Sequence, residues 1–173
     1  MKTADVIIVG SGASGLFNAL FLPQDYKVIV ITKKEVEESD SFLAQGGISA
    51  LKNPEDYDSY FEDTMKAGHY ENDKGAVEKM IKESPQIIQD LKDFGVRFDL
   101  KDGEIEFTRE GGHSTFRILH HEDLTGKEIT SHLYEEAKKR DNITIMENCM
   151  MIDIIEKDGE CKGIVYKDQD GNF

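Results

Sequence analysis

The hydrophobic pattern of the first 32 residues predicts a strand, a helix and a second strand. Ala4–Val9 is a short apolar run rich in β-branched residues, which is typical of a parallel strand buried on both faces. In Gly15–Leu22 the apolar residues recur at helical spacing, and Lys27–Thr32 repeats the pattern of a buried strand. A strand, a helix and a strand within about 30 residues form a unit of the size that binds dinucleotides.

Two longer helices are predicted in the middle of the chain, after a loop-like stretch over residues 34–53. Asn53 suits the N-cap of the first helix, with Pro54 at its first helical position and Gly68 at its end. Asp73 suits the N-cap of the second helix, whose apolar face continues to Gly95.

Pro85 interrupts the second of these helices. Because proline has no N–H to donate, we expect either a kink or a fresh helix start capped by Ser84. The rest of the chain is predicted to hold short strands and one more helix: strands at Val96–Leu100 and Glu104–Thr108, a helix at Thr125–Arg140, a strand at Ile143–Glu147, and a hairpin of Met151–Glu156 with Gly163–Lys167.

This order of elements predicts an α/β fold in which a parallel, Rossmann-like sheet is followed by a β-hairpin or meander. The last residues, Asp170–Phe173, are a turn signal that invites a further strand. We therefore expect the chain to end within its fold, as a truncated domain.

Charge and composition exclude several classes of partner. A formal net charge of −14 repels nucleic-acid phosphate and anionic membrane surfaces. The two cysteines and five histidines show no metal-type spacing, so no metal site is predicted. No secretory signal opens the chain, and no segment nears the roughly 20 apolar residues of a membrane helix. We expect a cytoplasmic protein without a membrane partner.

Gly10, Gly12 and Gly15 spell G-x-G-x-x-G between the first predicted strand and helix. The first glycine allows a tight turn, the second lets the backbone approach a pyrophosphate, and the third lets helix and strand pack closely. Free N–H groups at the helix N-terminus attract phosphate. This context indicates nucleotide binding, and the alternative is a tight turn that holds nothing.

The end of the second predicted strand leaves the nucleotide open. NAD, and FAD in many flavoproteins, pairs with an Asp or Glu there, whereas this chain has Thr32 and Lys33. Threonine could bond a ribose hydroxyl and lysine could meet a phosphate. Lys33 could equally be a solvated strand end.

Three further segments carry a resemblance to a known family. They are SFLAQGGISA (Ser41–Ala50), TREGGHS (Thr108–Ser114) and RILHHEDLTG (Arg117–Gly126), which follow the glycine motif in that order. The series closely resembles the L-aspartate oxidases and, more distantly, the flavoprotein subunits of succinate dehydrogenase and fumarate reductase. The resemblance implies an FAD-binding domain of glutathione-reductase type, of which residues 1–173 are the N-terminal part.

In that family a Ser-Lys pair or its equivalent follows the second strand, and Thr32–Lys33 fits this variant. The resemblance implies that the glycine loop cradles the pyrophosphate, that residues 40–47 run along the flavin, and that two methionines approach the adenine. The implied cofactor-binding residues are Gly10, Ser11, Gly12, Ala13, Ser14, Gly15, Thr32, Lys33, Asp40, Ser41, Phe42, Leu43, Ala44, Gln45, Gly46, Gly47, Met150 and Met151. The methionines could also serve core packing.

Two positions separate the relatives. The respiratory subunits bond FAD covalently through a histidine, and Asp40 stands at the matching position, so the implied FAD is non-covalent. The glutamate of TREGGHS, Glu110, is implied to face the α-ammonium of the substrate, or it could form a surface ion pair with Arg109. His113 could bond substrate or tie down its loop, and His120 and His121 are expected to be structural.

The implied activity is oxidation of L-aspartate to iminoaspartate, the first step toward quinolinate and NAD, with FAD reoxidised by oxygen or fumarate. Quinolinate synthase is the implied pathway partner. The family's catalytic arginines, capping domain and C-terminal helical domain would lie beyond Phe173, so we expect residues 1–173 alone to be inactive. The alternatives are a fumarate reductase or succinate dehydrogenase type flavoprotein, a non-catalytic nucleotide-binding module, and an NAD-dependent Rossmann enzyme.

Overall fold

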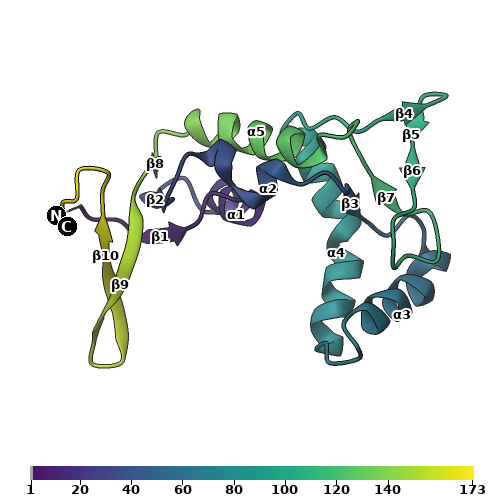
Figure 1. Ribbon diagram of the computed structural model, residues 1–173, viewed down its shortest axis with the longest axis horizontal. Coiled ribbons are helices and arrows are strands. Elements are labelled where there is room, and N and C mark those ends of the chain that lie inside the picture. Colours follow the sequence, from purple (N-terminus) through teal and green to yellow (C-terminus); the bar gives the residue numbers. More distant parts are fainter. Residues whose placement is uncertain (1) are drawn as a thin grey trace. The chain divides into compact units, whose positions relative to one another are not determined.

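The computed structural model describes residues 2–173, which form two compact units (Figure 1). The first contains the residues up to Leu43 together with Ile129–Phe173, and the second contains Ala44–Glu128. Helix α5 (Thr125–Lys138) begins in the second unit and has its larger part in the first.

The first unit is built on a parallel sheet with strand order β1-β2-β8. Strand β1 (Val6–Val9) pairs with β2 (Val28–Ile31), which pairs with β8 (Ile143–Met146). Helix α1 (Ala13–Phe21) connects the first two strands and buries Ala19 against β2. These elements confirm the predicted β-α-β unit and the parallel sheet.

Burial differs between the two predicted central strands. All four residues of β2 are buried, as its apolar run predicted. In β1, however, Ile7 is 37% exposed and Val9 is 52% exposed, so the prediction of burial on both faces is wrong for this strand. The reason is position: β1 lies at an edge of the three strands, and α1 packs against Ile8 on only one of its faces.

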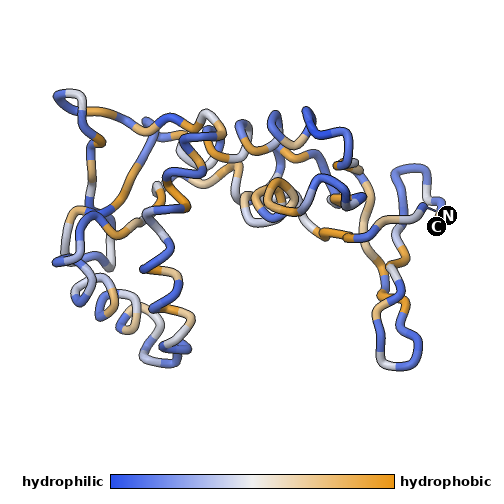
Figure 2. Tube along the Cα trace, turned by 180° about the vertical axis from the view of Figure 1, so that it is seen from behind, coloured by the Kyte–Doolittle hydropathy of each residue, from blue (hydrophilic) through white to orange (hydrophobic). Residues whose placement is uncertain are grey.

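A long antiparallel hairpin completes the first unit. It consists of β9 (Met150–Lys157) and β10 (Glu160–Lys167), whose turn residues Asp158 and Gly159 both have positive φ. This turn matches the twist of the strands and confirms the predicted hairpin. Hydrophobic and hydrophilic stretches alternate along the strands of the hairpin, and its tip is hydrophilic (Figure 2).

The second unit combines two helices with very short strands. Helix α3 (Tyr57–Ala67), preceded by the 3-10 helix η2 (Pro54–Asp56), packs on α4 (Lys74–Asp93) around Tyr60 and Ile81. The strands are β3 (Ile48–Ser49), β4 (Leu100–Lys101), β5 (Glu104–Ile105), β6 (Phe107–Thr108) and β7 (Ile118–Leu119). They form a β3-β7-β6 sheet and a separate β4-β5 pair.

The predicted helix caps are confirmed. Asn53 Oδ1 accepts a hydrogen bond from the N–H of Asp56 at 3.0 Å, and Asp73 Oδ1 accepts one from Ala76 at 2.7 Å. Gly68 is the C-cap of α3. The side chains of Asn53 and Asp73 thus accept hydrogen bonds from N–H groups that lack a partner within the helix.

Helix α4 is continuous through Pro85, so the predicted fresh start capped by Ser84 is wrong. Proline cannot donate to the carbonyl four residues earlier, which belongs to Ile81. Ser84 Oγ donates to that oxygen at 2.7 Å and accepts the N–H of Leu51 at 2.8 Å. The serine hydroxyl therefore replaces the helix hydrogen bond that Pro85 removes.

Two other stretches differ from the predictions. The loop-like residues 34–53 contain the 3-10 helix η1 (Val36–Glu38), the short helix α2 (Asp40–Leu43) and β3. The predicted strand Val96–Leu100 forms only at its last residue, because the backbone donors before it have other partners: Val96 N–H bonds the last turn of α4, and Arg97 N–H bonds the carboxylate of Glu128.

Candidate functional site

The carboxyl ends of the three parallel strands meet at one edge of the first unit. Backbone hydrogen bonds join them there: Gly10 N–H donates to Ile31 O at 2.8 Å, and Thr32 N–H donates to Met146 O at 2.9 Å. Beyond the last strand, Cys149 N–H donates to Thr32 O at 2.9 Å. Open α/β sheets bind their ligands at this edge. A pocket of about 590 Å³ lies here, with walls from the ends of β1 and β2 and from residues that follow β8.

The glycine motif forms the first wall of this pocket. A Cβ on Gly15 would lie 2.1 Å from the carbonyl oxygen of Gly10, so only glycine allows α1 to pack this closely against the end of β1. Gly12 is the N-cap of α1 and forms no side-chain cap. The first N–H groups of the helix are therefore available to an anion.

Ser11 is a buried polar residue without a partner in the protein. It is 2% exposed, and its Oγ forms no hydrogen bond. A buried hydroxyl without a hydrogen bond lowers the stability of the protein unless a ligand or water supplies the missing partner. Ser11 lies between two motif glycines on the pocket wall, so the bare oxygen marks a polar ligand position.

Charged groups line the rim next to β2. Lys33 and Lys34 are exposed there, and Lys34 forms an ion pair with Glu38 of η1. Asp40, at the start of α2, is exposed on the same rim. The rim therefore presents both signs of charge to a ligand.

Cys149 is a thiol in the wall of the pocket. It is 7% exposed, whereas the second cysteine, Cys161, is exposed on β10. Burial raises the pKa of the Cys149 thiol, and the carboxylate of Asp168 adds to this shift. Cys149 therefore stays protonated at neutral pH.

In the second unit, the TREGGHS segment contains a tight turn. His113 N–H donates to Glu110 O at 3.2 Å, and Gly112 has a φ of +85° between them. A positive φ at the third position defines a type II turn and requires glycine there. The turn leaves the Glu110 side chain exposed at its start, while the Arg109 guanidinium lies 5.8 Å from the Phe116 ring centre.

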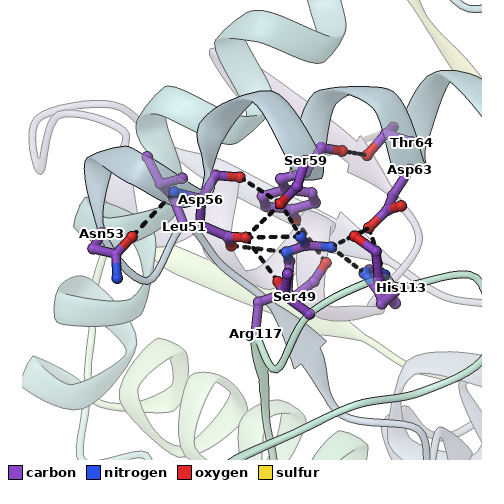
Figure 3. A network of polar contacts seen from close by, with 12 residues as sticks. Ser49, Leu51, Asn53, Asp56, Ser59, Asp63, Thr64, His113 and Arg117 are labelled. Atoms are coloured by element: carbon purple, nitrogen blue, oxygen red, sulfur yellow. Dashed lines mark hydrogen bonds and ion pairs between the residues drawn. The ribbon is translucent and has the colours of Figure 1, made fainter.

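Arg117 is the centre of a buried polar network in this unit (Figure 3). Its side chain is fully buried and forms a bidentate pair with Asp56 at 2.8 Å for both hydrogen bonds. Its Nη1 donates to Asp63 at 2.6 Å, and its guanidinium lies 4.8 Å from the Tyr60 ring centre. Two carboxylates compensate one buried cation, as a buried charge requires.

The same network fixes His113. Arg117 Nη1 lies 3.1 Å from His113 Nδ1. Because a guanidinium has donors only, Nδ1 must be the acceptor, which places the ring proton on Nε2. Asp63 also accepts the backbone N–H of Ser114 at 2.7 Å. Arg117 therefore helps to hold His113 and its loop in place, and a contact of His113 with substrate stays a prediction.

The network lowers the pKa values of both aspartates. Hydrogen bonds from Arg117 lower the pKa of Asp56 from 3.8 to about 2, with further bonds from Ser59 and Thr115. The pKa of Asp63 is lowered against the effect of burial, by hydrogen bonds from Ser114 and Arg117. Both carboxylates are charged at neutral pH.

His120 and His121 lie in a different part of the second unit, next to Asp99. His120 Nδ1 is 3.0 Å from Asp99 Oδ2, and His121 Nδ1 is 3.5 Å from Oδ1. Asp99 also accepts the N–H of Glu122 at 2.8 Å. These contacts link neighbouring loops, in keeping with the structural role expected for both histidines.

The model of the FAD binding domain family matches residues 5–172. The chain belongs to this FAD-binding family. The L-aspartate oxidase of Clostridium perfringens is 42% identical over 165 residues, which cover 95% of this chain and 38% of that protein. The L-aspartate oxidase of Clostridium acetobutylicum is 46% identical, over 92% of this chain and 37% of that protein. The chain thus spans less than two fifths of the length of these curated relatives.

The fold is also shared with a solved structure. In an E. coli quinol fumarate reductase, the similar region has a TM-score of 0.89 and 25% sequence identity. It covers 95% of this chain and 29% of that chain. This likeness confirms the α/β fold with a parallel sheet and the wider superfamily.

The pocket of the FAD-binding unit fits its cofactor. FAD carries a diphosphate, and the pocket offers the free N–H groups of α1 and the unpartnered hydroxyl of Ser11. Thr32 and Lys33 at the end of β2 line the same pocket with a hydroxyl and a cation.

The pocket brings together half of the predicted FAD-binding residues. Those that line it are Gly10, Ser11, Gly12, Thr32, Lys33, Asp40, Ser41, Met150 and Met151. Predicted residues that do not line it are Ala13, Ser14 and Gly15 in α1, Phe42 and Leu43 in α2, and Ala44, Gln45, Gly46 and Gly47 in the second unit. Contacts of both groups with FAD stay predictions.

Gly47 also has a reason that does not involve the flavin. Its φ is +80°, and a Cβ there would lie 2.6 Å from the carbonyl oxygen of Leu119 in β7. Glycine is thus required for the β3-β7 contact itself. Gly46, by contrast, has open space around its Cα, as the predicted approach of a ring would need.

Sequence reasoning did not assign to the site several pocket residues in and around η1, nor the first pocket residue after the third strand. They include Lys34, Glu35, Glu38, Ser39 and Cys149. The signal was present for Cys149, because parallel strands place their carboxyl ends at one edge and Cys149 comes three residues after β8. Among residues 2–173, no helix is long and apolar enough to span a membrane, and no cluster of His, Cys, Asp and Glu could hold a metal.

Proposed function

We propose that the protein oxidises L-aspartate to iminoaspartate. Forming the imine removes two electrons and two protons from the substrate, and bound FAD supplies a two-electron oxidant for this. Oxygen or fumarate would then accept the electrons. The observation that carries the proposal is the match to L-aspartate oxidases at 42% and 46% identity over more than nine tenths of the chain.

The TREGGHS turn supports an amino-acid substrate. Glu110 is an exposed carboxylate at the start of a tight turn, and the Arg117 network holds the other end of that turn through His113. A carboxylate held in this way attracts an α-ammonium group and disfavours a dicarboxylate that lacks one. Glu110 is therefore proposed to select aspartate over succinate.

The proposal extends to the cofactor bond and the partners. Asp40 stands at the position of the histidine that bonds FAD in the respiratory relatives, and a carboxylate does not form that link. We propose that the FAD is held without a covalent bond. Quinolinate synthase as the consumer of iminoaspartate and a cytoplasmic location belong to the same proposal.

The test uses the purified protein as its gene encodes it, with hydrogen peroxide formation and fumarate reduction as readouts. L-Aspartate should be oxidised in preference to succinate. Glu110→Gln should lower kcat/KM for aspartate roughly tenfold to a hundredfold, because a hydrogen bond to a charged group contributes about 1.5–3 kcal/mol. Glu104→Gln, on the exposed hairpin strand β5, is the matched control and should change little.

The second candidate function is that of a succinate dehydrogenase or fumarate reductase. The structural likeness to quinol fumarate reductase favours it. A flavin-loaded protein that acts on succinate or fumarate and ignores L-aspartate would establish this alternative and refute the proposed function.

A further inference from the structure

Glu147 is the first residue after β8, at the same edge of the sheet as the FAD pocket. Its Oε1 accepts the backbone N–H of Val36 at 2.8 Å, across 111 residues of sequence. Val36 is the first residue of η1, where a 3-10 helix has N–H groups without internal partners. No side chain of η1 or of its N-cap residue supplies that partner, so Glu147 caps η1 from the end of β8.

The segment that Glu147 holds is a wall of the pocket. Lys33, Lys34 and Glu35 line the pocket between two fixed points. The first point is Thr32, whose backbone bonds both Met146 and Cys149. The second is Val36, whose side chain is 1% exposed and whose N–H bonds Glu147. The three exposed side chains between them depend on both points for their place.

Glu147 itself does not line the pocket. A carboxylate would repel a diphosphate, and the carboxylate of Glu147 instead contacts the backbone of η1. The carboxylate also raises the pKa of Tyr134 in α5, after the larger effect of burial on that phenol. Glu147 thus connects β8, α5 and the segment after β2 without contacting the ligand space.

We propose that Glu147 is a positioning residue of the FAD site: its carboxylate holds residues 33–36 in the place where they form the wall of the nucleotide pocket. The inference rests on membership of the FAD-binding family and not on the proposed oxidation of aspartate. Its readout is therefore cofactor affinity, which does not depend on the substrate.

The experiment measures the Kd for FAD of flavin-free protein by quenching of flavin fluorescence. Glu147→Ala should raise the Kd about tenfold, and Glu147→Gln, whose amide oxygen can still accept the Val36 N–H, should stay within about threefold of the parent. Glu156→Ala is the matched control. Glu156 likewise accepts a backbone N–H, from Gly159, but it does so at the tip of the hairpin away from the pocket, so its Kd should not change.

Removing the donor tests the same bond from the other side. Val36→Pro deletes the N–H at a first helical position where the preceding residue, Glu35, is already extended and proline is tolerated. It should weaken FAD binding to a similar degree, and combining it with Glu147→Ala should weaken binding no further. Circular dichroism checks folding of each variant. If Glu147→Ala does not fold, the comparison rests on Glu147→Gln and Val36→Pro.

Two outcomes overturn the proposal. One is a folded Glu147→Ala or Val36→Pro protein that binds FAD as tightly as the parent. The other is additive weakening in the double variant, which would show that the two residues act separately. A protein that binds FAD as expected and fails to oxidise aspartate would contradict only the proposed function.

Discussion

At the scale of single residues, Gly15 shows how one missing atom determines a local structure. The carbonyl oxygen of Gly10 occupies the space that a side chain at position 15 would need. The sequence motif predicted this close packing, and the 2.1 Å contact of an added Cβ explains it. The contact also fixes the N-terminus of α1 at the pocket.

Gly15→Ala should therefore destabilise the protein and weaken FAD binding. Inserting a methyl group into a filled site costs about 1–3 kcal/mol in unfolding free energy. Gly111→Ala is the control, because a Cβ there meets nothing within 4 Å and should change the stability by about 0.5 kcal/mol or less. The unfolding free energies of the two variants are measured by urea unfolding. Equal values would refute the argument.

Asp56 predicts a loss of stability in acid. The pKa of Asp56 is about 2 in the folded protein, whereas an aspartate in the unfolded chain has its ordinary pKa of 3.8. The charged carboxylate therefore stabilises the folded protein above pH 3.8. That contribution, about 2 kcal/mol, is lost as the pH falls from about 4 to about 2. The lowered pKa of Asp63 acts in the same direction.

The check is urea unfolding at pH 5 and at pH 3. The parent should lose about 1 kcal/mol through Asp56 over this interval, and Asp56→Asn should lack that part of the loss. The variant should also be less stable by about 3 kcal/mol at pH 5, because Arg117 stays buried with only Asp63 as a counter-charge. An identical acid loss in both proteins would show that Asp56 is not responsible.

At the scale of elements, helix α4 shows how a side chain can overrule a helix breaker. Ser84→Ala should cost about 1–3 kcal/mol, because it leaves the carbonyl of Ile81 and the N–H of Leu51 without partners. With Pro85→Ala present, the residue at position 85 regains an N–H for Ile81. The cost of Ser84→Ala should then fall to about half, as a double-mutant cycle of unfolding free energies would measure. Additive effects would contradict this account.

Local patterns were sufficient where an element depends on its own residues. Caps at Asn53 and Asp73, the β-α-β unit and the hairpin turn at Asp158 all follow from such rules. Local patterns failed at Ser84 and at β1, because the outcome there depends on surroundings that the local sequence does not show. At Ser84 a hydroxyl replaces the missing helix hydrogen bond, and at β1 one face has no covering layer.

The candidate site divides in the same way. The glycine loop, Thr32 and Lys33 could be found from motif and spacing. Arg117 could not, because its partners Asp56 and Asp63 lie 61 and 54 residues away, and the sequence showed only scattered arginines. The same holds for Glu147 and Val36. Contacts across such separations follow from the topology and not from local pattern.

At the scale of the whole molecule, strong negative charge coexists with exposed apolar surface. Ile152, Ile154 and Ile155 of β9 are each about half exposed. An apolar pocket of about 480 Å³ lies between that hairpin and the sheet face that carries Ile7 and Ile29. The net charge of −14 opposes association through such surfaces.

Raising the salt concentration should therefore increase self-association of the 173-residue chain. Salt at about 1 M reduces the screening length to about 3 Å, which removes the repulsion and leaves the apolar attraction. Ile154→Thr should lower the association measured by light scattering, whereas Leu100→Thr, at a somewhat more exposed apolar site in the second unit, should not. Association that decreases with added salt would refute this balance of forces.

The two thiols offer a natural gauge of pocket occupancy. The sulfur of Cys149 lies in the wall of the nucleotide pocket, while that of Cys161 is open to solvent. Comparing how fast a small alkylating reagent modifies each, within one sample, cancels differences in reagent strength and protein concentration. Cys149 reacts slowly because it is buried and protonated, and we expect FAD in the pocket to slow its reaction further relative to that of Cys161.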